Sequence, residues 1–458
     1  MAIVDPALLR RTAELAIQHL ASIDARPVGA ESGQAEIRAA LPDGLPEEGL
    51  AAADVVEELV RGLDGGLTAS PGPRYFGFVT GGALPAALAA DWLTAAWDQN
   101  SFSAVSSPAA GAVEAVVAEW VKDLLGLPTG ASVGLVTGGQ MANVTGLAAA
   151  RHAVLARAGW DVDERGLAGA PPVRVFAGAD AHVTVGRALR LLGLGAARDR
   201  VVPADGQGRM HASALAELLA EGEGPAIVCA QAGNVNSGAF DPLPEIVAAA
   251  REHGAWVHVD GAFGLWARAS PAFAGLAAGA EGADSWATDA HKWLNVPYDC
   301  GIVAVADPET HSAAMSMQAA YLVRSDGDER SNSDWAPEAS RRARAVPVYA
   351  ALRSLGRGGV AALVERCCAL ARRIADAVQR EPAIAVLNDV VLNQVLVRVH
   401  DDDAATDAAI AAIQRDGTCW VGGTRWQGRS AIRISISSWA TTEADVDRSA
   451  AAIRAAVR

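Results

Sequence analysis

Short apolar runs alternate with amphipathic segments through the middle of the chain. The runs are apolar on both faces, as strands buried inside a parallel sheet are, and they cover residues 133–136, 173–177, 226–233, 255–259, 285–288 and 300–305. Between them lie segments with the three- to four-residue apolar spacing of helices, at 139–157, 184–192 and 243–252. This strand–helix–strand order predicts a mostly parallel sheet covered by helices, which is the α/β fold class.

The pattern changes towards both ends of the chain. Residues 6–23 and 50–63 have helical periodicity, with Asp5 as a candidate N-cap. From residue 384 onward, strand-like runs at 390–399 and 431–437 accompany further helical segments. The sequence therefore predicts three units: an N-terminal helical segment (1–70), a large α/β domain (71–355) and a small α+β C-terminal domain (356–458).

Composition excludes several classes of partner. A net charge of −15 argues against nucleic acid or an anionic membrane. The longest apolar stretch, 81–97, is broken by Pro85 and Asp91, so we expect no membrane span. It lies inside residues 69–108, where closely spaced proline, glycine and aromatic residues predict a loop-rich segment.

The five cysteines give little sign of metal or disulfide chemistry. Their number is odd, and their spacing matches no metal-ligand pattern. Most lie in apolar surroundings, which favours buried free thiols in a reducing compartment. We therefore expect no metal site and a cytoplasmic location.

Lysine is rare in this chain, which makes each lysine a candidate for special chemistry. Among 38 lysines and arginines, only Lys122 and Lys292 are lysines. Arginine stays protonated at any accessible pH, whereas a lysine amine can lose its proton and attack a carbonyl group. The count alone does not distinguish a functional Lys292 from an accidental one.

The neighbours of Lys292 strengthen its candidacy. A buried strand delivers Asp260 at its carboxyl end, and the next strand delivers Asp289, His291 and Lys292. Ligands of open α/β sheets bind at the carboxyl ends of the strands, so Asp260 and Lys292 are expected to face one site. The two side chains could form a simple ion pair. They also match pyridoxal phosphate (PLP), which needs a lysine for its Schiff base and an acid at its pyridine nitrogen.

Two motifs carry a resemblance to a known family. The sequences HVDGAFG at 258–264 and TDAHKWLNVPYDCG at 288–301 resemble those of the group II PLP-dependent amino-acid decarboxylases, relatives of the aromatic-amino-acid and glutamate decarboxylases. The resemblance extends from about residue 70 to the C-terminus. It implies PLP fold type I (aspartate-aminotransferase-like), and a homodimer with the active site at or near the subunit interface. The implied reaction converts an L-amino acid to its amine and CO2 through the Lys292 Schiff base.

The same resemblance implies a set of cofactor contacts. His182 would stack on the pyridine ring, and Asp260 would hold the ring nitrogen protonated. Glycines at a helix N-terminus leave backbone N–H groups free for an anion, so the PLP phosphate is assigned to Gly138, Gly139 and Gln140, with Asn143 supporting the turn. The remaining implied cofactor contacts are Asn234, Ala262, Asp289 and His291.

Three residues are candidates for binding the amino-acid substrate. The resemblance places Tyr75 and Phe76 near the substrate side chain, which favours an apolar or aromatic one. Arg433 lies in an apolar strand, where a buried cation needs a partner. That partner is either the substrate carboxylate or a structural carboxylate, and the sequence leaves both open.

One departure from the family's pattern leaves the reaction outcome open. Polar residues 321–334 correspond to a flexible lid that carries a tyrosine shortly before a tryptophan. Counting back from Trp335, the tyrosine position falls near Asn332, which cannot act as an acid of suitable pKa. The alternatives to simple decarboxylation are oxidative deamination to an aldehyde, and a PLP-binding protein without catalysis.

Overall fold

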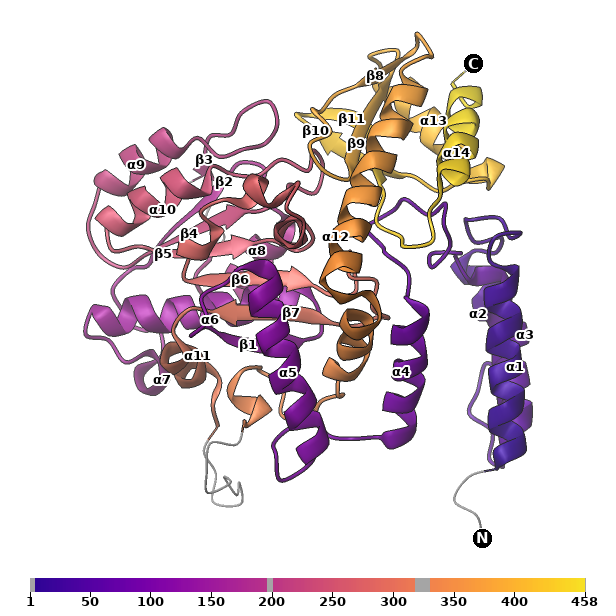
Figure 1. The fold of residues 1–458 in the computed structure, drawn as a ribbon, viewed down its shortest axis with the longest axis horizontal. Coiled ribbons are helices and arrows are strands. Elements are labelled where there is room, and N and C mark those ends of the chain that lie inside the picture. Colours follow the sequence, from indigo (N-terminus) through magenta and orange to yellow (C-terminus); the bar gives the residue numbers. More distant parts are fainter. Residues whose placement is uncertain (1–4, 196–200, 318–329, 458) are drawn as a thin grey trace.

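The computed structural model describes residues 5–195, 201–317 and 330–457 (Figure 1). The N-terminal helices stand beside the main body as a separate bundle (Figure 1). Asp5 caps the first of them by accepting a hydrogen bond from Ala7 N, as predicted. These helices are α1 (Pro6–Ser22), α2 (Gln34–Ala40) and α3 (Ala52–Leu63).

A seven-stranded sheet forms the centre of the large unit. Its strand order is β1-β7-β6-β5-β4-β2-β3, and all pairings are parallel except those of β7, which is antiparallel to both neighbours. The predicted mostly parallel sheet is confirmed. Its strands are β1 (Ser132–Val136), β2 (Arg174–Gly178), β3 (Val201–Val202), β4 (Ala226–Gln231), β5 (Trp256–Asp260), β6 (Ser285–Asp289) and β7 (Gly301–Val305).

Helices cover both faces of this sheet, so its strands are buried on each side (Figure 1). One face packs against α6 (Gly139–Arg157), α8 (Val183–Leu191) and α11 (Pro308–Met315), with the short α7 (Val162–Arg165) beside α6. The other face packs against α5 (Pro108–Leu125), α9 (Ala212–Ala220), α10 (Leu243–Glu252) and α12 (Ala345–Val378). Short 3-10 helices lie at Asp64–Gly66, Gly264–Ala269, Ala274–Ala277, Ala280–Gly282 and Asn332–Asp334.

The segment predicted to be loop-rich contains a helix, α4 (Pro85–Trp97), which packs along α12. Pro85 occupies the first helical turn, where a missing N–H costs nothing. The rest of the segment, 69–84 and 98–107, is without helix, as predicted. The sequence interpretation did not separate α4 from these loops because Trp92, Leu93 and Trp97 are exposed, so the helix shows little contrast between a polar and an apolar face.

The C-terminal unit is a four-stranded antiparallel sheet of order β10-β11-β9-β8 with two helices. Helix α12 runs into this unit, and Gly356, with φ of 62°, interrupts it next to the predicted boundary at residue 355. The elements are β8 (Ile384–Val386), β9 (Gln394–Val399), β10 (Gly422–Trp426), β11 (Arg429–Ser435), α13 (Asp403–Asp416) and α14 (Glu443–Ala455).

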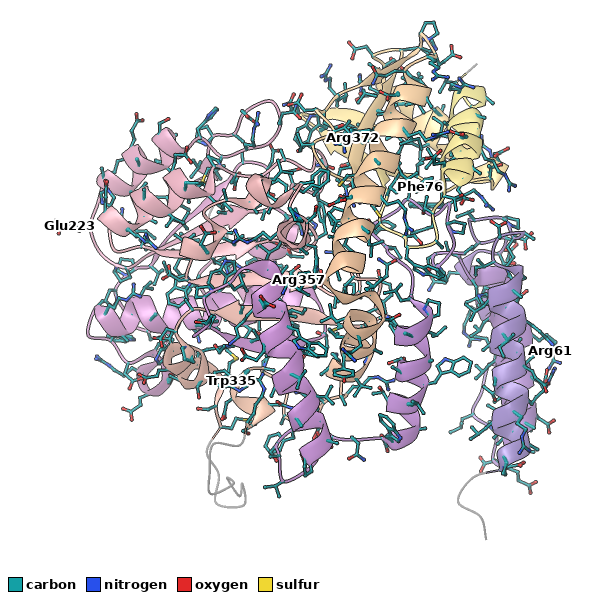
Figure 2. All side chains as sticks on the ribbon, in the orientation of Figure 1. Arg61, Phe76, Glu223, Trp335, Arg357 and Arg372 are labelled. Atoms are coloured by element: carbon teal, nitrogen blue, oxygen red, sulfur yellow. The ribbon has the colours of Figure 1, made fainter. Side chains whose placement is uncertain are left out.

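The chain at residues 75–77 joins the large unit to the C-terminal unit. Phe76 donates its backbone N–H to Trp420 O at 2.9 Å and accepts from Ser435 N at 3.0 Å, and it lies next to the C-terminal unit in Figure 2. This pairing brings the aromatic segment and strand β11 together at one edge of the large sheet.

All five cysteines are buried and free. Within the described residues, no helix is long and apolar enough to cross a membrane. The same part of the chain holds no cluster of three or more His, Cys, Asp or Glu side chains suited to a metal ion.

Candidate active site

A cavity lies at the carboxyl ends of the central strands, where open α/β sheets bind ligands. Gln231 ends β4, Asp260 ends β5, and Lys292 follows β6, while His182 is the N-cap of α8 after β2. The structure thus brings Lys292, Asp260 and His182 to one cavity, although they are far apart in sequence. Its lining residues are His182, Gln231, Gly233, Val235, Asp260, Ala262, Phe263 and Lys292.

Lys292 forms an ion pair, and its partner is Asp289 rather than Asp260. Lys292 Nζ lies 2.8 Å from Asp289 Oδ2. Burial lowers the pKa of Lys292, but the charge and hydrogen bond of Asp289, together with the nearby Asp260 and Tyr298, outweigh burial, so the net pKa is raised above the ordinary value of 10.5. The amine is therefore held charged until Asp289 releases it.

His291 also approaches Asp289. Its Nε2 lies 3.6 Å from Asp289 Oδ1, and its Nδ1 accepts a hydrogen bond from the Cys300 backbone N–H at 3.1 Å. Burial lowers the pKa of His291, so the neutral ring with its hydrogen on Nε2 is favoured. The Tyr298 ring contacts this ring at an interplanar angle of 36°, with centroids 4.6 Å apart.

Missing side chains leave a space at the glycine turn before α6, and His291 and the Asp289 carboxylate border this space. A Cβ on Gly139 would lie 2.7 Å from Asp289 Oδ2, and one on Gly138 would lie 3.1 Å from His291 Cε1, so side chains here would close the space. The first N–H groups of a long helix open onto this space and favour an anion. Buried Asp289 Oδ1 has no hydrogen-bond partner among the described residues. Gln140 instead donates to Thr184 O at 3.2 Å, so its side chain turns towards α8.

The Asp260 carboxylate is held on both oxygens. Ala262 N donates to Oδ1 at 3.2 Å, and Asn143 Nδ2 donates to Oδ2 at 3.1 Å. The predicted role of Asn143 in supporting the glycine turn is therefore wrong, because its side chain points from α6 across to β5. Only 6% of Asp260 is exposed, and it faces the cavity.

His182 is oriented by the residue two positions later. Its Nδ1 lies 2.7 Å from Thr184 Oγ1 and accepts from Thr184 N at 3.4 Å. Burial lowers the pKa of His182, partly opposed by the Asp260 charge. The ring is therefore neutral near pH 7, and its flat face is available for stacking.

Arg433 on β11 is a half-buried cation without a carboxylate partner among the described residues. Its Nε makes no hydrogen bond, and no ion pair to it is found within the described part of the chain. Burial lowers the pKa of Arg433, and burial also raises the pKa of nearby Tyr75 to about 12. Tyr75 stacks on Trp420 with centroids 5.0 Å apart. An unpaired guanidinium beside an aromatic pair is suited to an amino acid that carries both a carboxylate and an apolar side chain.

Phe76 and Asn234, both predicted contacts, do not face the cavity. Phe76 is 1% exposed and packs in the main hydrophobic core. Asn234 is fully buried, with its Nδ2 donating to Asp180 O and its Oδ1 accepting from Asn236 N and Ser237 N. Its amide stabilises the loop after β4, because asparagine readily bonds to backbone N–H groups two and three positions later.

Asn332 has a structural role instead of a place in a lid. It is fully buried, donates from Nδ2 to Ser101 Oγ at 3.0 Å and accepts at Oδ1 from Arg330 Nε at 2.9 Å. Arg330 in turn lies 3.3 Å from the buried Glu114. The amide therefore belongs to a buried polar cluster, and residues 321–329 of the predicted lid lie outside the described residues.

Tyr298 is a residue of the site that the sequence interpretation missed. Its ring lies tilted against His291, and its hydroxyl lies 3.4 Å from Thr80 Oγ1. It lies inside the quoted TDAHKWLNVPYDCG motif, so its position six residues after Lys292 was the available signal.

PLP carries an aldehyde, a basic ring nitrogen and a phosphate. The Lys292 amine suits the aldehyde, the Asp260 carboxylate suits the ring nitrogen, and the glycine turn before α6 is left for the phosphate. The sheet order with its antiparallel β7, and the site at its carboxyl edge, define the PLP enzymes of fold type I. The family model described as "Pyridoxal-dependent decarboxylase conserved domain" matches residues 35–400, and the chain belongs to this family. It is an amino-acid carboxy-lyase with PLP as its cofactor.

Individual relatives agree with this assignment. An aromatic-L-amino-acid decarboxylase of Bacillus atrophaeus is 29% identical over 350 residues, which cover 75% of this chain and 71% of that protein. A phenylacetaldehyde synthase of a Rosa hybrid cultivar is 27% identical over 372 residues, covering 77% and 72%. The crystal structure of Oryza sativa TDC with PLP and tryptamine has a TM-score of 0.92 at 24% identity, covering 100% of this chain and 99% of that one.

Replacing Asp289 by asparagine tests the Lys292 ion pair. Without the carboxylate, burial dominates, so the pKa of Lys292 falls and more of the amine is neutral near pH 7. We expect apoprotein with D289N to take up PLP faster than the parent near pH 7, with the pH profile of uptake displaced to lower pH. Stopped-flow absorbance measures this rate, and slower uptake at every pH would contradict the expectation.

Proposed function

We propose that this enzyme decarboxylates an aromatic L-amino acid to the corresponding amine and CO2. The observation that carries the proposal is the convergence of Lys292, Asp260 and His182 on one cavity. The unpaired Arg433 and the Tyr75–Trp420 stack support the aromatic substrate. The aromatic-amino-acid decarboxylases among the relatives point the same way.

The proposed roles follow from the position of each side chain. When bound, PLP supplies an aldehyde and an electron-accepting ring. Lys292 Nζ would hold the cofactor aldehyde and give it up to the substrate amine. Asp260 would hold a proton on the ring nitrogen. His182 would pack against the face of the ring and keep it in place.

Arg433 is proposed to bind the substrate carboxylate. Replacing it by methionine keeps the length of the side chain and removes the charge. We expect R433M to raise KM by roughly 10- to 100-fold, because a hydrogen bond to a charged group contributes about 1.5–3 kcal/mol. Steady-state kinetics measure the change, with R425M, which removes an exposed arginine on β10, as the matched control.

An unchanged KM in R433M would assign Arg433 a structural role. The same kinetics on R433K separate charge from shape, since lysine restores a point charge without the planar pair of donors. A KM for R433K between those of parent and R433M is expected.

A substrate panel tests the reaction itself. The PLP-loaded enzyme is incubated with natural L-amino acids, and CO2, amine, aldehyde and peroxide are measured together. CO2 with an equal amount of aromatic amine and no peroxide is the expected result. Decarboxylation of glutamate or another acidic amino acid alone would overturn the aromatic assignment.

The same panel tests oxidative deamination. In that reaction the amino acid, O2 and water give aldehyde, CO2, ammonia and hydrogen peroxide in equal amounts. One relative is a phenylacetaldehyde synthase, so aldehyde and peroxide are measured directly. Their appearance in equal amounts with CO2 would replace the amine assignment. PLP bound without CO2 from any amino acid would favour the non-catalytic alternative.

We further propose that the enzyme is a homodimer with its active sites at or near the interface. The N-terminal bundle and α4 expose a set of large apolar side chains and enclose an apolar groove of about 630 Å³. Burial of such a patch by a second copy removes apolar area from water. Light scattering during size-exclusion chromatography measures the mass, and a monomer at micromolar concentration would contradict the proposal. The exposed side chains are Leu9, Ile17, Leu20, Val55, Leu59, Val60, Trp92 and Trp97.

A further inference from the structure

A chain of buried hydrogen bonds runs from the core of the large sheet to Asp260. Trp256 Nε1 donates to Ser285 Oγ at 2.9 Å, and Ser285 Oγ lies 2.8 Å from His258 Nδ1. His258 Nε2 lies 2.9 Å from Asn143 Oδ1, and Asn143 Nδ2 donates to Asp260 Oδ2 at 3.1 Å. Each of the five residues is at most 6% exposed, so water does not compete for these bonds.

The chemistry of the groups fixes the direction of every bond. A carboxylate only accepts, so Asn143 turns its nitrogen to Asp260 and its oxygen to His258 Nε2. His258 therefore carries its hydrogen on Nε2 and donates to the Asn143 oxygen. The bare Nδ1 of the neutral ring then accepts the hydrogen of Ser285 Oγ, which itself accepts from the Trp256 indole N–H. All donors thus point towards the carboxylate.

His258 is held in this one form by its surroundings. Burial lowers the pKa of His258 to about 4, so the ring stays neutral through the ordinary working range. A Cβ on Gly146 would lie 2.8 Å from His258 Cε1, so the absence of a side chain at this position of α6 leaves room for the ring. The ring therefore has neither a second charge state nor free space in which to turn.

The Asn143 amide also reaches the other side of the site. Its Nδ2 lies 3.2 Å from Thr184 Oγ1, and Thr184 Oγ1 lies 2.7 Å from His182 Nδ1. Thr184 accepts from the amide and directs its own hydrogen to His182. If the Asn143 amide were turned over, its oxygen would face the Asp260 carboxylate. Asp260 and Thr184 would then each lose the hydrogen bond that Asn143 Nδ2 donates.

We propose that Asn143 is a positioning residue that orients both Asp260 and His182, and that the Trp256–Ser285–His258 chain sets the orientation of its amide. The Asn143 amide then links Asp260, the residue for the pyridine nitrogen of PLP, to His182, the residue for the face of the pyridine ring. The proposal rests on PLP as the cofactor. It does not depend on which amino acid is the substrate.

The test compares two substitutions at His258. H258F keeps a flat ring and removes both hydrogen bonds. H258Q keeps a donor for Asn143 and an acceptor for Ser285. W286F is the matched control, because Trp286 is a buried indole on β6 that donates to Ala280 O outside this chain of bonds. Thermal unfolding of all three separates loss of stability from loss of positioning.

Two readouts that need no substrate decide the outcome. PLP affinity is expected to fall roughly 10- to 100-fold in H258F and to stay within about threefold of the parent in H258Q and W286F. The 15N NMR shift of PLP labelled at its ring nitrogen is expected to move towards the unprotonated value in H258F alone. Because neither readout involves turnover, failure here is distinguishable from failure of the proposed reaction.

Two results would overturn the proposal. One is a protonated ring nitrogen and parental PLP affinity in H258F. The other is an equal loss in H258F and H258Q, which would show that ring shape matters and the hydrogen bonds do not. If H258F does not fold, S285A takes its place, since it removes the donor to His258 Nδ1, and the same shift in a smaller amount is expected.

Discussion

Replacement of Lys292 by alanine is expected to lower turnover by roughly 10⁴-fold or more, because no other described amine lines the cavity. K292R is expected to be equally inactive. Arginine preserves a positive charge for Asp289 but never loses its proton, so it cannot form a covalent bond with an aldehyde. Activity assays with saturating PLP, together with mass spectrometry after reduction with borohydride, measure turnover and covalent attachment separately.

Lys122 provides the matched control for this prediction, since it is the other lysine of the chain. It is buried on α5, bonds to Thr129 O at 2.7 Å and pairs with Glu119. K122A is expected to lower stability and leave turnover nearly unchanged. Substantial turnover in K292A, or covalent PLP on K292A after reduction, would contradict the assignment of Lys292.

Replacement of Asp260 by asparagine is expected to lower kcat by roughly 10²- to 10⁴-fold. The amide has nearly the same shape as the carboxylate but carries no charge, so it does not stabilise a proton on the ring nitrogen. PLP is expected to remain bound through Lys292. The measurements are kcat and the 15N shift of ring-labelled PLP, which should move towards the unprotonated value.

D284N is the control for removing a half-buried carboxylate next to the same sheet. Asp284 precedes β6 at the opposite end from Lys292 and accepts from Val257 N at 2.7 Å. The D284N substitution should change the stability of the protein without changing the 15N shift of ring-labelled PLP. A kcat for D260N within tenfold of the parent would mean that the reaction proceeds without a protonated ring nitrogen.

The sequence located Asp260 and Lys292 together because a general rule links them. The carboxyl ends of parallel strands meet at one edge of a sheet, so residues that follow two such strands can be placed without knowing any side-chain contact. No such rule predicted that β7 is antiparallel to its neighbours, because a short buried apolar run has the same pattern in a parallel and an antiparallel strand.

Residues that act through side-chain contacts were beyond reach of the sequence. Asn143 bonds to His258 across 115 positions, and nothing in the local pattern of α6 marks it. Asn332 was assigned by counting from Trp335, which gave its place in the chain but not its burial beside Ser101. The same limit applies to Phe76. The family resemblance picks out this residue, but only the structure shows that its backbone pairs with the C-terminal unit and that its ring packs in the core.

The antiparallel β7 separates the two strands that hold the ends of the cofactor site. Strand β1 leads into the glycine turn of α6, and β6 leads into Lys292, with β7 hydrogen-bonded between them. Adjacent strands are about 4.8 Å apart, so β1 and β6 lie roughly 10 Å apart. A Cβ on Gly301 would meet the Gly138 backbone at 2.4 Å, which keeps this spacing tight. Strand β7 therefore sets the spacing between the strand that leads into the glycine turn and the strand that leads into Lys292.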